Sequence, residues 1–210
     1  MPATSPETAI LVFAKAPLAG SVKTRLIPLL GAEGAAALHL QLLDHALATA
    51  RDAATGPLQL WCAPDPAHPA LQAAAAAHRA TLHLQQGPDL GARMAHAFSN
   101  SLRVHRHALC IGVDCPALTP QHLRDARGAL RDGHDAVFVP AEDGGYALAG
   151  LSCAAPELFE GIAWGGSQVM AQTRDRLRAA QLRWHELETL WDVDRPEDLQ
   201  RLRTSGWPCV

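Results

Sequence analysis

Short apolar runs recur along the chain, and longer segments with helical spacing lie between them. The apolar runs are residues 9–14, 58–63, 81–85, 107–113, 135–141 and 145–151. The intervening segments 33–54, 66–79, 90–105 and 120–132 are rich in helix formers or carry apolar residues three and four positions apart. Strands that alternate with helices in this way predict an α/β fold, with a mostly parallel sheet and helices on both faces.

One segment interrupts this alternation. In PAEDGGYALAG, two strand-like runs follow each other with only a double-glycine turn between them. We therefore expect an antiparallel insertion near 141–151. The remaining chain predicts a helix over 167–180, a strand within 182–188 and a helix that begins at Pro196. Since no linker or internal repeat divides the sequence, we expect a single domain over residues 1–210.

Composition restricts the class of protein. A formal net charge of −3 gives no basic surface of the kind that nucleic-acid binding needs. The five cysteines are scattered without a C-x-x-C pair, which favours neither a zinc knuckle nor a disulfide framework. The polar N-terminus does not resemble a signal peptide, and no apolar run approaches the ~20 residues of a membrane helix. We expect a cytoplasmic protein without a membrane span.

Candidate chemistry is sought where the strands end, because ligands of open α/β sheets bind at the carboxyl ends of the strands. The first such place is VFAKAPLAGSVKTRLIPLL, residues 12–30, which contains Lys15 and Lys23, the two lysines of the chain. Together with Gly20 and Arg25 they could form a phosphate cradle before a helix N-terminus. The stretch does not fit a Walker A loop. An ordinary solvated loop is the alternative.

Two further strand ends carry carboxylates. Asp114 directly follows an apolar strand, where an aspartate either binds a cation or caps the next loop. Asp192 and Asp194 lie two residues apart in WDVDRPEDL, so in an extended segment both would face the same side. Oxygen ligands without histidine or cysteine suit Mg²⁺ or Mn²⁺. Alternatively, Asp194 is the N-cap of the last helix, with Glu197 completing a capping box.

The double-glycine turn is a candidate substrate site, formed by Asp143, Gly144, Gly145 and Tyr146, although it could also be a plain turn. Arg93 lies one turn into a helix that Asp89 is expected to cap, and it could reach a phosphate or a base. No Ser/His/Asp triad can be argued. Cys115 stands beside Asp114, but no basic residue is placed to activate it, so we do not expect a thiol nucleophile.

The motifs together resemble a known family. VFAKAPLAGSVKTRL, QQGPDLGARM, CIGVDCPAL, PAEDGGYALAGL, WGGSQV and DVDRPEDL are similar, in this order, to the DUF2064 family, also called radical-SAM/selenodomain-associated transferase 1. The resemblance implies the GT-A-like fold of nucleotide-diphospho-sugar transferases. A more distant likeness connects the chain to the phosphoenolpyruvate and 2-phospholactate nucleotidyltransferases.

The resemblance also implies roles for matching residues. It places phosphate binding at Lys23 and Arg25 with Lys15 nearby, and metal binding at Asp114, Asp192 and Asp194. Lys23, Arg25 and Asp114 are thereby the candidate catalytic residues. The chain has a lone Asp114 instead of a D-x-D pair, and Arg195 stands where a threonine is common.

These observations predict a Mg²⁺-dependent transferase that uses a nucleotide donor and a small-molecule acceptor. Nucleotidyl transfer from an NTP to a phosphorylated or hydroxylated acceptor leads, because three cations near the first strand suit a pyrophosphate leaving group. Glycosyl transfer from a nucleotide sugar is the alternative, and a non-catalytic nucleotide-binding protein is the third. The sequence leaves the base, the acceptor and the oligomeric state open.

Overall fold

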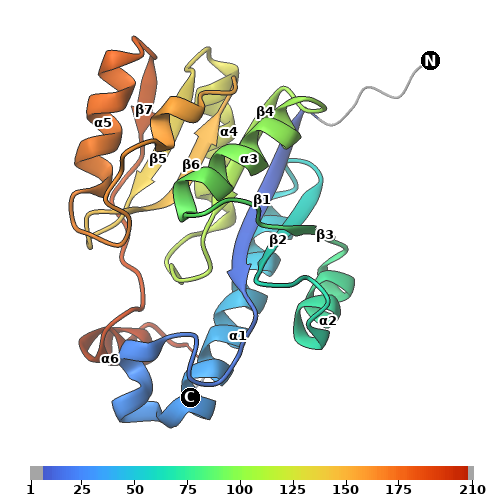
Figure 1. The fold of residues 1–210 in the computed structure, drawn as a ribbon, viewed down its shortest axis with the longest axis vertical. Coiled ribbons are helices and arrows are strands. Elements are labelled where there is room, and N and C mark those ends of the chain that lie inside the picture. Colours follow the sequence, from blue (N-terminus) through green and yellow to red (C-terminus); the bar gives the residue numbers. More distant parts are fainter. Residues whose placement is uncertain (1–6, 208–210) are drawn as a thin grey trace.

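A single twisted sheet organises the molecule (Figure 1). The computed structural model describes residues 7–207, and its strands follow the order β3-β2-β1-β4-β6-β5-β7. Pairing is parallel for β1 with β2 and β4, for β2 with β3, and for β5 with β7. Strand β6 runs antiparallel between β4 and β5. The predicted parallel sheet and its antiparallel insertion are confirmed. The strands are β1 Thr8–Lys15, β2 Leu58–Ala63, β3 Thr81–Leu84, β4 His107–Ile111, β5 Ala136–Pro140, β6 Tyr146–Leu151 and β7 Trp184–Glu186.

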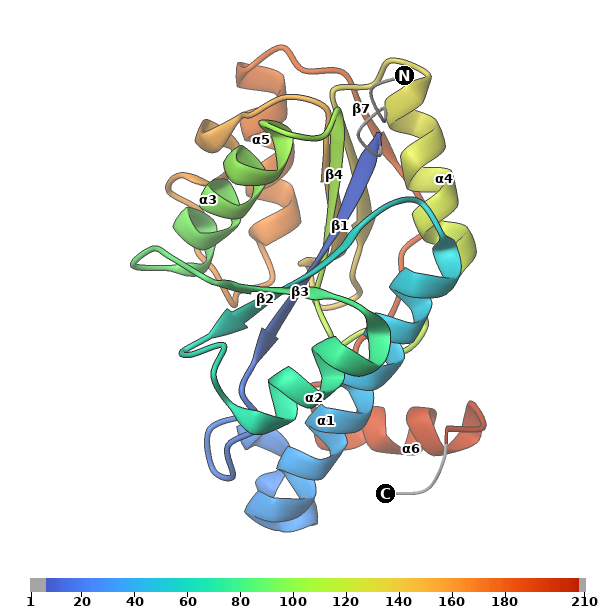
Figure 2. The same cartoon turned by 90° about the vertical axis from the view of Figure 1, so that its right-hand side faces the viewer.

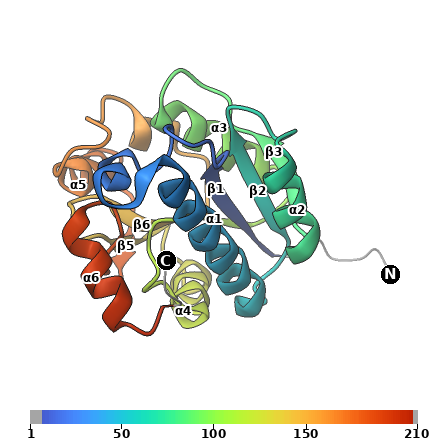
Figure 3. The same cartoon turned by 90° about the horizontal axis from the view of Figure 1, so that it is seen from below.

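Helices cover both faces of the sheet. Helices α1 (Ile27–Ala53), α2 (Pro69–His78) and α4 (Pro120–Arg131) share a core with one face. Helices α3 (Leu90–Leu102) and α5 (Val169–Ala179) cover the other, as Figure 2 shows. Seen from below, β1 lies between α1 and α3 (Figure 3). The last helix, α6 (Pro196–Thr204), is placed beside α1 at the end of the sheet where the parallel strands finish.

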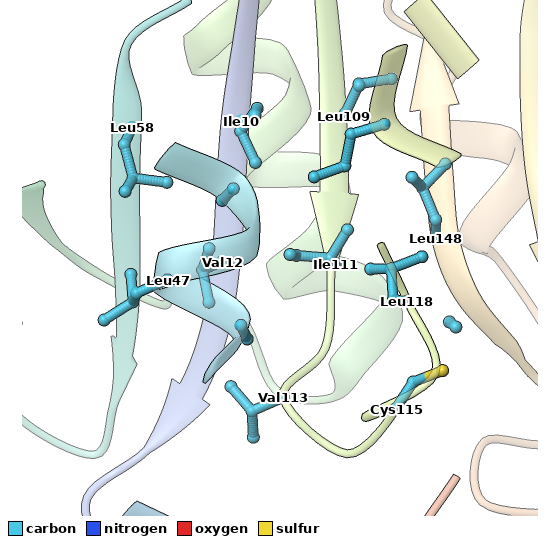
Figure 4. Packing of buried hydrophobic residues seen from close by; sticks show 14 of the residues in the cluster. Ile10, Val12, Leu47, Leu58, Leu109, Ile111, Val113, Cys115, Leu118 and Leu148 are labelled. Carbon is cyan, nitrogen blue, oxygen red and sulfur yellow. The ribbon is translucent and has the colours of Figure 1, made fainter. Parts of the chain in front are cut away.

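Side-chain alternation along the strands separates the two cores. Ile10 and Val12 of β1 point to the side of Leu47 in α1 (Figure 4), whereas Leu11 packs in the cluster that contains Phe98 of α3. Each of these side chains is at most 1% exposed. A strand that is buried on both faces needs a continuous apolar run, which is the pattern from which β1 was predicted.

Helix α1 consists of two helical parts, and the second agrees with the helix predicted over 33–54. The two parts are separated at Gly31, whose φ of 70° and ψ of 168° are not helical. The segment Thr24–Ala53 has an 18-residue window of mean hydropathy 1.4, so by length and composition alone it could cross a membrane. The expectation that no apolar stretch of that length exists is therefore wrong for this helix. In the structure four of its leucines, Leu38, Leu42, Leu43 and Leu47, are fully buried within the protein, whereas Leu29 and Leu40 are exposed.

Two predicted helix starts are confirmed. The Asp89 carboxylate accepts a hydrogen bond from the backbone N–H of Ala92 at 2.8 Å, at the start of α3. Thr119 forms a capping box with His122 at the start of α4. Both caps lie on loops that lead away from strand ends, so they help to fix the entrance of each helix at the carboxyl edge of the sheet.

Candidate active site

A cavity of about 340 Å³ opens at the carboxyl ends of the strands. This volume lies in the range of small-molecule sites. Polar lining comes from the loop after β1, the end of β4, the β5–β6 turn and the segment after β7. The polar residues that line it are Arg25, Asp114, Asp143, Tyr146, Asp192 and Asp194. Gly145 also lines the cavity, so seven of the residues selected from the sequence meet in one place.

The arm that carries Asp192 and Asp194 is fixed against Asp114. Between the two aspartates, Val193 is fully buried, and its backbone N–H donates to the carbonyl of Asp114 at 2.8 Å. Because alternate residues of an extended segment face opposite sides, a buried Val193 turns both aspartates toward the cavity. The i, i+2 spacing thus places two carboxylates on the same side as Asp114.

The cations of the loop after β1 do not form the free cradle that the sequence suggests. The Lys23 ammonium lies 2.6 Å from Oδ1 of Asp114 and also donates to the carbonyl of Val193, with its side chain only 3% exposed. Arg25 lines the cavity and pairs with Asp194. Lys15 is exposed and Gly20 occupies a turn with φ 81°; neither lines the cavity.

The electrostatics of the cavity favour a cation. Burial, together with the facing carboxylates of Asp143 and Asp114, raises the pKa of Asp192 to about 6. Two of the cavity's four carboxylates are paired, Asp114 with Lys23 and Asp194 with Arg25, so two negative charges are left over. Oxygen donors with two surplus charges match Mg²⁺ or Mn²⁺ in chemistry. Within residues 7–207, no three Asp, Glu, His or Cys side chains lie close enough together to form a ready-made metal site.

Apolar residues also line the cavity, and they were not identified from the sequence. Phe13, Leu90, Met94 and Trp164 line it, beside Tyr146. The Tyr146 hydroxyl lies 3.9 Å from the Met94 sulfur, and its ring meets Trp164 edge to face at 6.4 Å. Burial raises the pKa of Tyr146, so it stays a neutral hydrogen-bonding group. Trp164 begins the WGGSQV segment, which was the available signal for this wall.

The double-glycine turn fits closely against that segment. A Cβ at Gly144, where φ is +90°, would lie 2.6 Å from the carbonyl carbon of Ser167 and 2.7 Å from its Cα. The carbonyl of Gly144 accepts from the N–H of Met170 at 2.8 Å. Next to it, Asp143 accepts from the N–H of Gly145 at 2.8 Å. The turn is therefore packed against Ser167 and the start of α5, and its packing fixes where Asp143 enters the cavity.

The structure differs from the sequence-based expectations for Asp194 and Arg93. Asp194 is not the N-cap of α6: the carboxylate of Asp198 accepts from the N–H groups of Asp194 and Arg195 at 2.9 and 2.6 Å, and Arg195 is the N-cap. Asp198 takes the capping role because the Asp194 side chain turns to Arg25. Arg93 does not line the cavity; its Nε donates to the carbonyl of Gly87 at 3.0 Å.

Cys115 lies at the cavity as a hydrogen-bond donor. Its thiol donates to the carbonyl of Trp191 at 3.1 Å, and burial raises its pKa to about 12. A thiol of this kind is protonated at neutral pH, which agrees with the expectation that it is not a nucleophile. It adds a third link between the end of β4 and the arm at 191–194.

Comparison with known proteins decides the family. The model of DUF2064, described as an uncharacterized protein conserved in bacteria, matches residues 46–166, which is more than half of the chain. The chain belongs to this family. A comparison with curated proteins gives no match. The resemblance inferred from the sequence motifs is thus confirmed, and the matched region contains Asp114 and the double-glycine turn.

Solved structures relate the DUF2064 fold to nucleotide-dependent transferases. A proposed nucleotide-diphospho-sugar transferase from Desulfovibrio desulfuricans G20 is 31% identical, with a TM-score of 0.85 over 95% of this chain and 87% of that one. A cytidylyltransferase from Leptospira borgpetersenii is 13% identical (TM-score 0.61; 97% and 88% covered). Glucosyl-3-phosphoglycerate synthase from Mycobacterium tuberculosis, in complex with Mn²⁺, UDP and glucosyl-3-phosphoglycerate, is 10% identical (TM-score 0.56; 96% and 77% covered). The predicted fold, that of nucleotide-diphospho-sugar transferases, is confirmed by these neighbours.

Proposed function

We propose that the protein is a glycosyltransferase that depends on Mg²⁺ or Mn²⁺ and uses a nucleoside-diphosphate sugar as donor. The observation that carries this proposal is the group of carboxylates around Asp114 and Asp192, whose negative charge exceeds that of the cations beside it. The 31% identical neighbour is a proposed nucleotide-diphospho-sugar transferase, and a more distant one was crystallised with Mn²⁺ and UDP. The first supports a nucleoside-diphosphate donor, and the second supports a metal that binds together with it.

The residues of the cavity would have different roles in this reaction. Asp114 and Asp192 would hold the cation, with Asp194 nearby; once bound, the cation would neutralise charge on the diphosphate. Arg25, whose side chain is 61% exposed, would exchange Asp194 for a phosphate oxygen. The acceptor hydroxyl would form a bond to the anomeric carbon as the bond to the diphosphate breaks. Its proton would pass to a carboxylate, for which Asp143 is placed in the cavity.

Nucleotidyl transfer is the second candidate. The sequence favoured it because of three cations in the loop after β1. In the structure, Lys23 is bound to Asp114 and Val193, and Arg25 is the cationic side chain that reaches the cavity among the described residues. A departing pyrophosphate would therefore find less positive charge than the sequence implied. The exposed Lys15, the last residue of β1, keeps this reaction open to test.

Product analysis distinguishes the two reactions. The purified protein is incubated with a panel of nucleotide sugars and NTPs, with Mn²⁺, Mg²⁺ or EDTA. We expect metal-dependent release of a nucleoside diphosphate from a nucleotide sugar. Pyrophosphate release from an NTP would instead establish the second candidate, and metal-independent or absent nucleotide binding would contradict both.

The Asp192→Asn variant tests the metal site within the same assay. It removes one ligand charge, so kcat/KM should fall by about 100-fold or more, since metal stabilisation of the transition state amounts to several kcal/mol. Asp175→Asn is the matched control, because Asp175 is an exposed carboxylate of α5 that pairs with Arg178. Equal activity of the two variants would contradict the assignment of Asp192.

A further inference from the structure

Lys23 joins three separate segments of the chain. Its ammonium contacts Oδ1 of Asp114 at 2.6 Å and donates to the carbonyl of Val193. The side chain is only 3% exposed, whereas the side chain of Asp114 is 53% exposed. The ammonium thus faces protein oxygens, and the carboxylate that it holds still faces the cavity.

The segments on either side of Lys23 are fixed independently. Leu26, three residues after Lys23, packs in one small apolar cluster with Val193 and with Leu199 of α6. The N–H of Val193 donates to the carbonyl of Asp114 at 2.8 Å. The loop after β1, the end of β4 and the arm after β7 therefore meet around a single buried ammonium.

We propose that Lys23 is a positioning residue for the cation site and does not contact the phosphates of the donor. It holds one oxygen of Asp114 and the peptide of Val193, and so sets the directions in which Asp114, Asp192 and Asp194 enter the cavity. This role rests on the divalent-cation site proposed above. It differs from the phosphate-binding role that the sequence motif implies.

The chemistry of the side chain explains why a lysine stands here. All other Lys and Arg positions except Lys15 are arginine. An ammonium is compact, and its three N–H groups can point to acceptors in different segments. A guanidinium presents its donors in a flat fork that suits a single carboxylate or phosphate. Between Asp114 and the carbonyl of Val193, the compact group is the better fit.

Mn²⁺ binding without nucleotide tests the proposal. A positioning role and a purely electrostatic role of Lys23 predict opposite changes in Mn²⁺ affinity when the residue is replaced. Lys23→Met removes a positive charge beside the site, so by Coulomb attraction alone Mn²⁺ should bind more tightly. If Lys23 positions the ligands, Mn²⁺ should bind about 10- to 100-fold more weakly, as on loss of other supporting contacts of metal sites. Binding is measured by titration calorimetry and by the EPR signal of free Mn²⁺, and thermal unfolding verifies the fold.

Two further variants make the result decisive. Arg178→Met is the matched control, since it breaks an exposed ion pair on α5, and it should leave Mn²⁺ affinity unchanged. Lys23→Arg keeps the charge and bulk, so it serves if the methionine variant does not fold, and it should also weaken Mn²⁺ binding. Unchanged or tighter binding in a folded Lys23 variant would overturn the proposal. If the wild-type chain itself bound no Mn²⁺, the metal site would fail and this role with it.

Discussion

Gly144→Ala should destabilise the protein strongly through a clash that no flexible side chain can relieve. A Cβ there would lie 2.6 and 2.7 Å from backbone atoms of Ser167, in a conformation with φ +90°. The glycine is held on both sides, since its N–H donates to Ala141 at 3.0 Å and its carbonyl accepts from Met170 at 2.8 Å. The turn therefore cannot move away from Ser167 without losing hydrogen bonds.

The magnitude has two parts. A non-glycine residue in a left-handed conformation costs about 1–3 kcal/mol, and overpacking typically adds about 1–3 kcal/mol. For a chain of this length, each kcal/mol lowers the Tm by about 2–4 °C, so a fall on the order of 10 °C is expected. The assay is thermal unfolding followed by circular dichroism.

Gly165→Ala isolates the clash from the backbone strain. Gly165 has φ +79°, but a Cβ there would meet no atom within 4 Å. Its substitution should therefore cost only the conformational part, about 1–3 kcal/mol. Equal Tm losses for the two alanine variants would refute the argument that Ser167 excludes a side chain at Gly144.

The remaining predictions concern titratable groups. Hydrogen bonds from Arg174 hold the pKa of Glu186 below its usual value, so the stability this pair adds is present above the unfolded pKa of about 4.3 and is lost as pH falls through the folded pKa. Glu186→Gln should therefore lower unfolding free energy by up to about 1 kcal/mol at pH 7, and a difference that persisted unchanged to pH 2 in denaturant titrations would contradict this. Iodoacetamide at pH 8 should label the exposed Cys153 before Cys115, whose pKa burial raises to about 12. Peptide mass mapping measures the order and also separates Cys209, which lies outside the described residues; earlier labelling of Cys115 would contradict it.

The elements of the fold were predictable where local signals agree. Strand β2 matches residues 58–63 because prolines stand at both ends of its apolar run. Strand β7 is shorter than the predicted segment 182–188, since it lies at an edge of the sheet and pairs only with β5. The helix predicted over 33–54 matches the part of α1 that follows Gly31, because this glycine has a non-helical backbone conformation that separates it from the part before it.

The site was predictable in its residue types but not in its contacts. Carboxylates after buried strands are conspicuous in sequence, because an aspartate at the end of an apolar run needs a partner. The partner itself depends on tertiary structure: Lys23, Asp114 and Val193 approach one another only when three distant segments meet. For the same reason Phe13 and Met94 read as ordinary core residues, since periodicity shows which face a residue takes and not that the face borders a cavity.

The loop after β1 carries two cations with different freedom. The pair between Arg25 and Asp194 has side chains that are 61% and 37% exposed, and an ion pair in such surroundings contributes about 0–1 kcal/mol. Arg25 can therefore exchange its carboxylate for a phosphate oxygen at little cost. Lys23 is buried with two partners, and withdrawing it would take away the ammonium that the Asp114 carboxylate and the Val193 carbonyl share. In sequence, the motif suggests that all its cations bind phosphate. In the structure, Lys23 is instead a fixed group that arranges the carboxylates, and Arg25 is an exchangeable group that can meet the donor.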